Sequence, residues 1–232
     1  MNAAVTFENR PFHPRCIPMW GFSCYLPEYR VLFDTGSNGA VLLKNMEVMG
    51  ISPRDIEAVV LSHFHWDHTG GLLDLLQIHG EKRVYIHSGF SMTFAGEAQG
   101  LGAQVFVEDD PVEVLPGVVT TGAMAGAMEE QGLLVKGDRG WTLFTGCAHP
   151  GIVSMATRAT DMVGEPLYMV MGGFHLGGLS SGEVAGVARQ LLTLGVSLVA
   201  PCHCTGDQAI ETFAGIFGKR CLSVGVGMVL EI

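Results

Sequence analysis

The sequence predicts an α/β protein in which two β-sheets lie between layers of helices. Short apolar runs alternate with segments of helical periodicity, and strands are followed by helices in both halves of the chain. The middle of the chain is rich in β-type residues. Because no low-complexity linker interrupts the 232 residues, we expect a single domain over residues 1–232.

Strands and helices alternate through the first half. Apolar runs at residues 4–8, 18–26 and 31–33 predict three early strands. Residues 37–49 predict a helix that Gly50 ends, and Ser52 followed by Pro53 is typical of a second capped start. The run 58–61 then predicts a buried strand, residues 70–78 a helix, and residues 83–86 a further strand.

The second half begins with the β-rich segment 104–121, where turns are expected at residues 110–111 and 116–117. Residues 133–136 and 141–145, joined by a Gly-Asp-Arg-Gly turn, predict a hairpin. One theme then repeats, an apolar strand, a polar segment and a helix. It predicts strands at residues 167–171 and 197–200, helices at 180–194 and 207–217, and a last strand at 222–230.

Composition narrows the classes of function. A hydrophobic content of 48% with 16% charged residues describes a chain that buries a sizeable core. The net charge of −10 argues against nucleic acid as a partner, because phosphate binding needs a surplus of Lys and Arg. No apolar segment reaches the ~20 residues that a bilayer requires, so no membrane partner is expected. We expect a soluble protein with a small-molecule substrate, and the sequence leaves a homo-oligomer open.

Six cysteines and the amino terminus predict the compartment. The cysteines show no spacing typical of a disulfide framework. The first residues lack the apolar run of a signal peptide, so we expect a cytoplasmic protein with reduced thiols. Cys147, Cys202 and Cys204 lie within two residues of expected ligands, and we interpret them as small buried hydrophobes, with metal ligation or redox sensing as the alternative.

Asp34 lies in an Asp-Thr-Gly motif that raises the question of an aspartic protease. That chemistry needs two carboxylates close enough to share a proton, and a single chain should therefore contain the motif twice. Only one copy is present, and a homodimer with one motif per subunit would not need a chain of 232 residues. The sequence therefore predicts a different role for Asp34.

The densest chemical signal directly follows the expected strand 58–61. Residues 62–71 read Ser-His-Phe-His-Trp-Asp-His-Thr-Gly-Gly, with the spacing H-x-H-x-D-H. In an extended segment His63 and His65 point to the same side, so both imidazoles reach one ion. Asp67 and His68, at the turn into the next helix, can face a second ion nearby. The pattern predicts a metal centre with one or two ions.

Two such ions need further ligands, and three histidines lie just beyond other expected strands. His149 follows residues 141–145, His175 follows 167–171, and His203 follows 197–200. The carboxyl ends of strands are where α/β folds place their sites. We therefore expect these histidines to converge on the H-x-H-x-D-H segment.

Together these motifs resemble the metallo-β-lactamase superfamily, and the resemblance spans essentially the whole chain. It implies a four-layer αββα sandwich. It further implies two groups of metal ligands, namely His63, His65 and His149 for one ion and Asp67, His68 and His203 for the other. By the same resemblance Asp34 matches an acidic residue that supports the metal loop. Many hydrolases of the superfamily bridge their metals with an Asp, whereas residues 171–176 here contain no acid.

A narrower resemblance is carried by FDTG, SHxHxDHTGG, TGCxHxGI, GGFHL and HCTG. These motifs are similar to those of archaeal dihydropterin–ribofuranosylaminobenzene phosphate synthases, a branch often described as metal-dependent hydrolases. The resemblance implies an enzyme. It acts either as a hydrolase of a small ester or phosphate substrate, or as a dihydropteroate-synthase-like transferase that joins a pterin pyrophosphate to an arylamine. A non-catalytic metal-binding sensor is the alternative from another class.

For the hydrolase we expect metal-activated water, with Asp67 as a ligand that orients it and His175 as an acid/base group or extra ligand. Imidazole and carboxylate ligands suit zinc, our first expectation, as well as iron or manganese. Residues 129–131, Glu-Glu-Gln, are interpreted as a solvated acidic turn.

Overall fold

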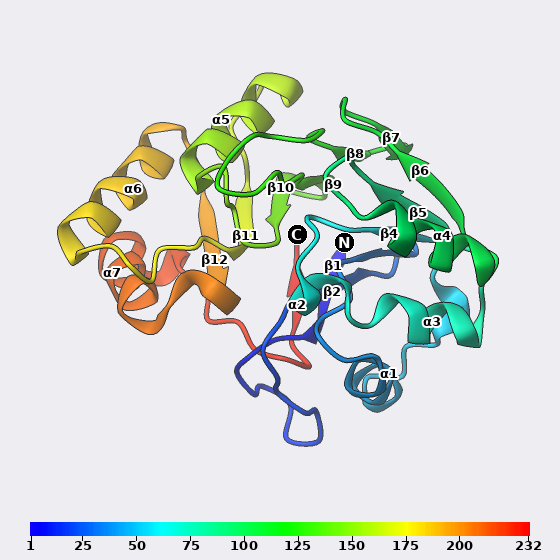
Figure 1. Ribbon diagram of the computed structural model, residues 1–232. Helices are drawn as coiled ribbons and strands as arrows, with labels where there is room; N and C mark the ends of the chain where they lie inside the picture. Colours follow the sequence, from blue (N-terminus) through cyan, green and yellow to red (C-terminus); the bar gives the residue numbers. More distant parts are fainter.

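The computed structural model describes residues 1–232 and contains two β-sheets. Strand order is β13-β1-β2-β3-β4-β5-β6 in the seven-stranded sheet and β12-β11-β10-β9-β8-β7 in the six-stranded sheet. Figure 1 shows β1 and β13, from opposite ends of the chain, beside each other in the first sheet. The strands are β1 Asn2–Phe7, β2 Ser23–Leu26, β3 Val31–Phe33, β4 Ala58–Val60, β5 Arg83–Ile86, β6 Gln104–Val107, β7 Glu113–Leu115, β8 Val118–Thr120, β9 Leu133–Gly137, β10 Gly140–Thr145, β11 Met169–Gly173, β12 Leu198–Cys202 and β13 Val229–Glu231.

Helices cover the outer face of each sheet, so the predicted four-layer αββα sandwich is confirmed (Figure 1). Helices α1 (Gly39–Val48), α3 (Leu72–Ile78) and α4 (Met92–Gly100) share an apolar cluster with the first sheet. Helices α5 (Ile152–Val163), α6 (Ser181–Thr193) and α7 (Asp207–Phe217) share another with the second sheet. None of the helices combines the length and the apolar character that crossing a membrane requires.

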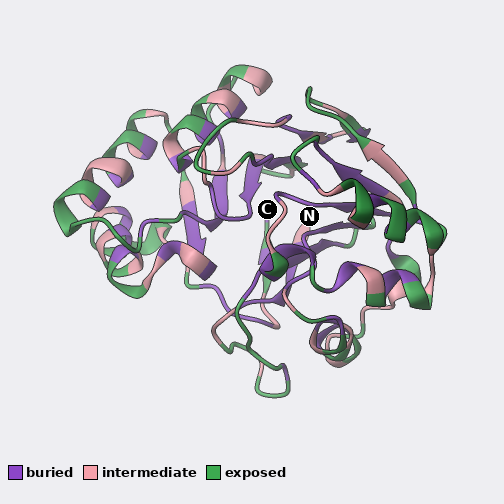
Figure 2. Cartoon of the chain, viewed as in Figure 1, coloured by how far each residue is buried: buried purple, intermediate pink, exposed green.

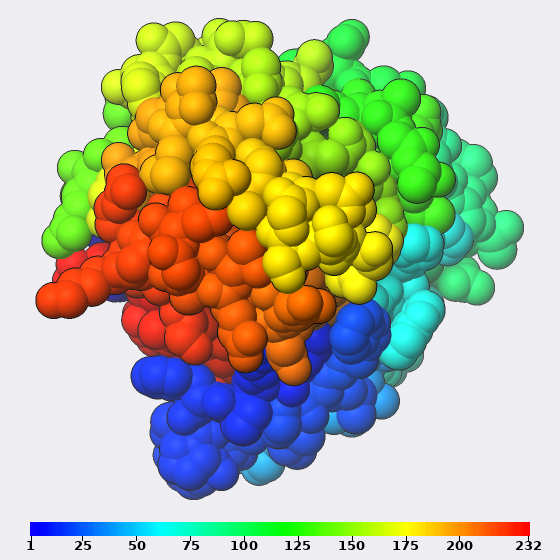
Figure 3. Space-filling view, turned by 90° about the vertical axis from the view of Figure 1, so that its left-hand side faces the viewer, coloured from blue at the N-terminus to red at the C-terminus, as the bar shows by residue number.

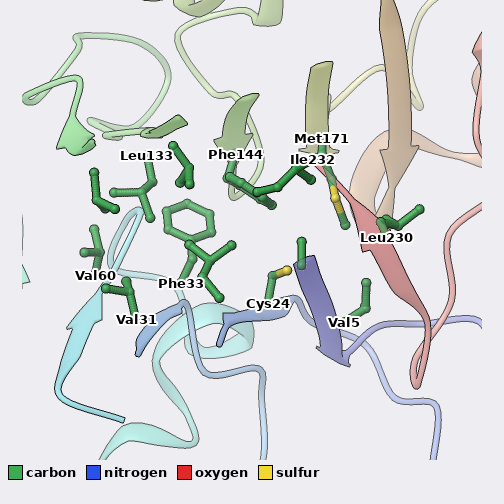
Figure 4. Packing of buried hydrophobic residues seen from close by; sticks show 14 of the residues in the cluster. Val5, Cys24, Val31, Phe33, Val60, Leu133, Phe144, Met171, Leu230 and Ile232 are labelled. Atoms are coloured by element: carbon green, nitrogen blue, oxygen red, sulfur yellow. The ribbon is translucent and has the colours of Figure 1, made fainter. Parts of the chain in front are cut away.

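The space between the sheets is filled by a third cluster, of 22 buried residues. Figure 4 shows Phe33 of the first sheet facing Phe144 of the second, and their ring centroids lie 6.3 Å apart. Burying each large apolar side chain of this kind stabilises the fold by roughly 1.5–3 kcal/mol. The strands are therefore held firmly, while the outward faces of the helices remain exposed (Figure 2).

Strand direction decides where the loops meet. Strands β3 to β6 are mutually parallel in the first sheet, and β10 to β12 are parallel in the second. Parallel strands direct their following loops to one edge of a sheet. The segments after β3, β4, β10, β11 and β12 carry Asp34, the H-x-H-x-D-H motif, His149, His175 and His203.

The structure corrects several predicted elements. Helices α4 and α5 lie where none is expected, and Gly96 and Gly100 weaken the helical signal of α4. The last strand, expected at 222–230, is short, since β13 spans only Val229–Glu231 and Gly227 before it has φ +89°. Residues 18–22 are likewise outside β2. The second half of the H-x-H-x-D-H motif forms the one-turn helix α2, Trp66–Thr69.

Candidate metal centre

The predicted ligands meet at the edge where the two sheets direct their loops. In the space-filling view the cyan segment after β4, the yellow segment after β11 and the blue amino-terminal segment meet on one face (Figure 3). The donor atoms of His63, His65 and His149 all lie within 4.8 Å of one another. Those of a second group satisfy the same limit, and its members are Asp67, His68 and His203. The structure thus brings all six predicted ligands together, in the two groups that the family resemblance implies.

The two groups lie against each other. The ring of His63, from the first group, lies 4.3 Å from the ring of His68, from the second, measured between centroids. The centroid of His149 is 4.8 Å from that of His63, and His203 is 4.9 Å from His68. Two ions held by these groups would therefore be close neighbours.

The donor set fits divalent metal ions. The Nε2 atoms of His149 and His203 are buried and have no hydrogen-bond partner. Buried polar atoms normally have one, and a metal ion bound to these nitrogens would take that place. Two N or O ligands of a tetrahedral zinc ion stand about 3.3 Å apart. Asp67 Oδ2 lies 3.3 Å from His203 Nε2 and 3.8 Å from His68 Nε2. These separations are those of ligands that surround one ion.

Burial also sets the protonation of the histidines. Desolvation, together with the neighbouring imidazoles, lowers the pKa of His63 far below its usual range and that of His149 to about 4. At neutral pH both rings are therefore uncharged, which is the form that binds metal.

Asp34 forms hydrogen bonds with residues 62–71, the segment that carries the H-x-H-x-D-H motif. Its Oδ1 accepts from the Ser62 backbone N–H at 2.7 Å, and its Oδ2 accepts from the Ser62 hydroxyl at 2.8 Å. His68 Nδ1 lies 2.7 Å from the same Oδ2 and donates to it, which leaves Nε2 facing Asp67 and Cys147. Asp34 itself has φ +55°, a conformation that the surrounding contacts impose.

The same carboxylate governs the charge of His68. Burial disfavours the charged ring, but the attraction of Asp34, Asp67 and Glu130 outweighs it and raises the pKa of His68 to about 9. A metal ion that binds Nε2 therefore displaces a proton.

Glu130 belongs to the site although no sequence motif marks it. It is expected in a solvated turn, yet it is fully buried. Its Oε1 accepts from the backbone N–H groups of Gly146, Cys147 and Ala148, each at 2.9 Å. Its Oε2 accepts from the N–H of His149, also at 2.9 Å. The solvated-turn prediction is therefore wrong for Glu130, whose carboxylate shapes the loop that presents His149.

Glu8 supports the segment that carries His203, as Glu130 supports the segment that carries His149. The Glu8 side chain is fully buried, and its Oε1 accepts from the His203 N–H at 2.8 Å. The neighbouring Asn9 donates to the His203 carbonyl at 3.0 Å. Burial raises the pKa of Glu8. Each of the three segments that carry predicted ligands, after β4, β10 and β12, therefore forms hydrogen bonds with its own buried acid, namely Asp34, Glu130 and Glu8. Only Asp34 is marked by a sequence motif.

Two cysteines and His175 form a further group at the same place. The donor atoms of Cys147, His175 and Cys204 lie within 4.8 Å of one another. Cys147 Sγ is 3.3 Å from His68 Nε2, and the ring of His175 lies 4.5 Å from that of His149. Cys202 instead packs in the core between the sheets, as predicted. Cys147 is buried, as predicted, and Cys204 is half-buried, but both sulfurs also lie beside polar groups.

One cavity borders the histidines. It has a volume of about 350 Å³ and is lined by His149 and His175 together with apolar side chains that include Phe174, Leu176 and Leu179. A small organic molecule can therefore approach the cluster from the side of His175. Trp20 lies on another side, where its Nε1 donates to Asp67 Oδ2 at 2.7 Å.

Comparison with known proteins agrees with this geometry. The family model of the metallo-beta-lactamase superfamily matches residues 23–167. A 7,8-dihydropterin-6-methyl-4-(beta-D-ribofuranosyl)-aminobenzene-5'-phosphate synthase of Methanocaldococcus jannaschii is 28% identical, over 87% of this chain and 84% of the relative. A solved metal-dependent hydrolase of the beta-lactamase superfamily superposes with a TM-score of 0.83 at 27% identity, covering 100% of this chain and 99% of its own. A metallo-beta-lactamase fold protein from Bacillus subtilis superposes at 0.70 with 17% identity, covering 99% of this chain and 98% of its own. The chain therefore belongs to the metallo-beta-lactamase superfamily.

Proposed function

We propose that this protein is a metal-dependent hydrolase that acts on a small ester- or phosphate-containing substrate. One observation carries the proposal, namely six ligand-type side chains in two adjacent groups, with two buried imidazole nitrogens that lack a partner. Divalent ions at these groups would activate water and polarise the bond under attack. Zinc is the first choice for this ligand set, followed by iron or manganese.

The ligand roles follow the two groups. His63, His65 and His149 would hold one ion, and Asp67, His68 and His203 the other. Asp67 also accepts a hydrogen bond from Trp20, which limits its rotation and keeps one oxygen directed at His203. That fixed orientation suits a carboxylate that both binds metal and orients a water molecule.

His175 is the proposed acid/base group. Its side chain is exposed, lines the cavity of about 350 Å³ and lies beside His149. A hydrogen bond to Cys204 raises its pKa, opposing the effect of its partial burial. A proton held at this ring would stand where a leaving group in the cavity needs one.

The proposed substrate class rests on the lining of the cavity beside His175 and on the net charge of the chain. A small molecule with an apolar part suits the lining of Phe174, Leu176 and Leu179. Nucleic acid does not suit a chain with net charge −10. The six cysteines are all free, which fits the reducing cytoplasm that we propose as the compartment.

Transfer chemistry is a second candidate, favoured by one observation. The relative that covers 87% of this chain at 28% identity is a synthase. A reaction that joins a pterin pyrophosphate to an arylamine would use the same ions to stabilise the leaving group. The two candidates differ in whether the acceptor is water or an amine.

Metal analysis tests the proposal first. Protein purified without added metal or chelator should contain one or two ions per chain, and a His63→Ala/His65→Ala variant should lose at least one. Loaded protein is then screened with phosphoesters, thioesters and lactones, and with a pterin pyrophosphate in the presence and absence of an arylamine. Folded Asp67→Asn protein should lose turnover.

Three outcomes separate the candidates. Turnover in water alone supports the hydrolase, and a strict need for the arylamine supports the transferase. Metal binding without turnover on any substrate would favour a sensor. Protein that is folded, metal-free and unable to bind zinc, iron or manganese would overturn all three.

A further inference from the structure

The six proposed ligands carry little negative charge for two metal ions. Two divalent ions bring four positive charges, whereas Asp67 is the one anionic member of the two groups. Charges buried this close repel strongly unless an anion lies between them. No carboxylate is available in residues 171–176, and the oxygens of Asp34 and Glu130 already accept hydrogen bonds from the loops.

Cys147 lies where such an anion is needed. Its sulfur and the donor atoms of His63 and His68 lie within 4.8 Å of one another, and these histidines belong to different groups. The 3.3 Å between Cys147 Sγ and His68 Nε2 is close to the roughly 3.6 Å expected between sulfur and nitrogen ligands of one tetrahedral zinc ion. We propose that the Cys147 thiolate is a metal ligand shared by the two ions, an inference that rests on the proposed metal centre.

The surrounding structure holds this sulfur in place. The Cys147 backbone N–H donates to Glu130 Oε1 at 2.9 Å, which fixes the backbone that carries this side chain. The absence of a side chain at Gly173 makes space for both cysteines, because a Cβ there would lie 3.2 Å from the Cys147 Cα and 2.6 Å from the Cys204 sulfur. Cys204 lies next to Cys147, and its thiol donates to the Cys147 carbonyl at 3.7 Å. Of the two sulfurs only that of Cys147 is grouped with both His63 and His68, so Cys147 is the ligand and Cys204 lies outside the ligand set.

Cobalt substitution provides a direct readout, because a thiolate bound to Co²⁺ gives a near-ultraviolet charge-transfer absorption that imidazole and carboxylate ligands do not. Reduced wild-type protein titrated with Co²⁺ should develop this absorption as the ions bind. Cys147→Ser should abolish it and weaken binding of one ion by at least about tenfold. Cys147→Asp should keep two ions per chain without the absorption, since a carboxylate can take the shared place.

Two controls make the assignment specific. Cys221→Ser, in a half-buried residue outside the cluster, and Cys204→Ser should both retain the absorption. Circular dichroism checks that each variant is folded. The proposal is overturned if wild-type protein binds two Co²⁺ ions without thiolate absorption, or if Cys147→Ser retains it. In either case the metal centre itself stands, whereas protein that binds no Co²⁺ at all sinks both proposals.

Discussion

Replacing Glu130 with Gln tests whether a buried carboxylate builds the ligand loop. The change keeps the size of the side chain and one acceptor oxygen. That oxygen can still serve the three N–H groups of Gly146, Cys147 and Ala148. The new NH₂ group then faces the N–H of His149, where the carboxylate now accepts at 2.9 Å.

The expected loss of folding stability comes from the N–H of His149, which loses its acceptor. Leaving a buried donor unsatisfied costs roughly 1–3 kcal/mol. The other three bonds weaken as their acceptor becomes neutral, and relief from burying a charge offsets that weakening. Burial raises the pKa of Glu130 to about 7, so measurements belong above that pH, where the wild-type side chain is ionised. We therefore expect about 1–3 kcal/mol of destabilisation and, because His149 loses its support, a ~10–100-fold weaker metal affinity.

Urea unfolding of metal-free protein gives the first quantity, and competition with a chromophoric chelator gives the second. Glu129→Gln is the matched control, because Glu129 is exposed and next to Glu130, and it should change stability by less than about 0.5 kcal/mol. If both variants match wild type in stability and in metal affinity, the support role assigned to Glu130 is refuted.

Asp34→Asn should weaken metal binding ~10–100-fold in the chelator assay, since an amide has one acceptor oxygen and cannot serve the Ser62 backbone N–H as well as the Ser62 hydroxyl and His68; unchanged affinity would contradict this. Burial lowers the pKa of Lys82 to about 8 from 10.5, so the folded protein binds fewer protons in that window and stability should rise with pH there. Unfolding of Lys82→Met across that range should lack this rise, and parallel curves would count against it. Gly36→Ala should lower the melting temperature, because φ is +66° and a Cβ would meet the Phe7 ring at 2.4 Å. Gly96→Ala, open and helical, should raise stability by up to about 1 kcal/mol, and equal effects of the two alanines would refute the steric argument.

The part of the site that could be predicted from sequence is local or lies at strand ends. His63, His65, Asp67 and His68 occupy one short segment, so their spacing alone indicates a metal centre with one or two ions. His149 and His203 could be found because each follows an apolar strand, and parallel strands direct their loops to one edge. Their grouping came from the family resemblance, and the structure agrees with it.

The support of those loops could not be read in the same way. Glu8 and Glu130 have no local pattern that separates them from surface acids, and Glu129 beside Glu130 is in fact exposed. Their partners are distant in sequence, since Glu8 binds the N–H of His203. Whether an acid is solvated or buried against backbone N–H groups depends on which loops pack around it.

The sequence by itself determined the alternation of strands and helices, the apolar core and the cluster of metal-ligand residues, because periodicity, capping and close spacing act over a few residues. Tertiary structure alone decided that Cys147 faces His63 and His68 and that Glu130 is buried beneath its loop. It also decided that helix α4 forms from a glycine-containing segment. These features arise where packing brings distant segments together, and the burial they create changes the protonation and the partners of each polar group.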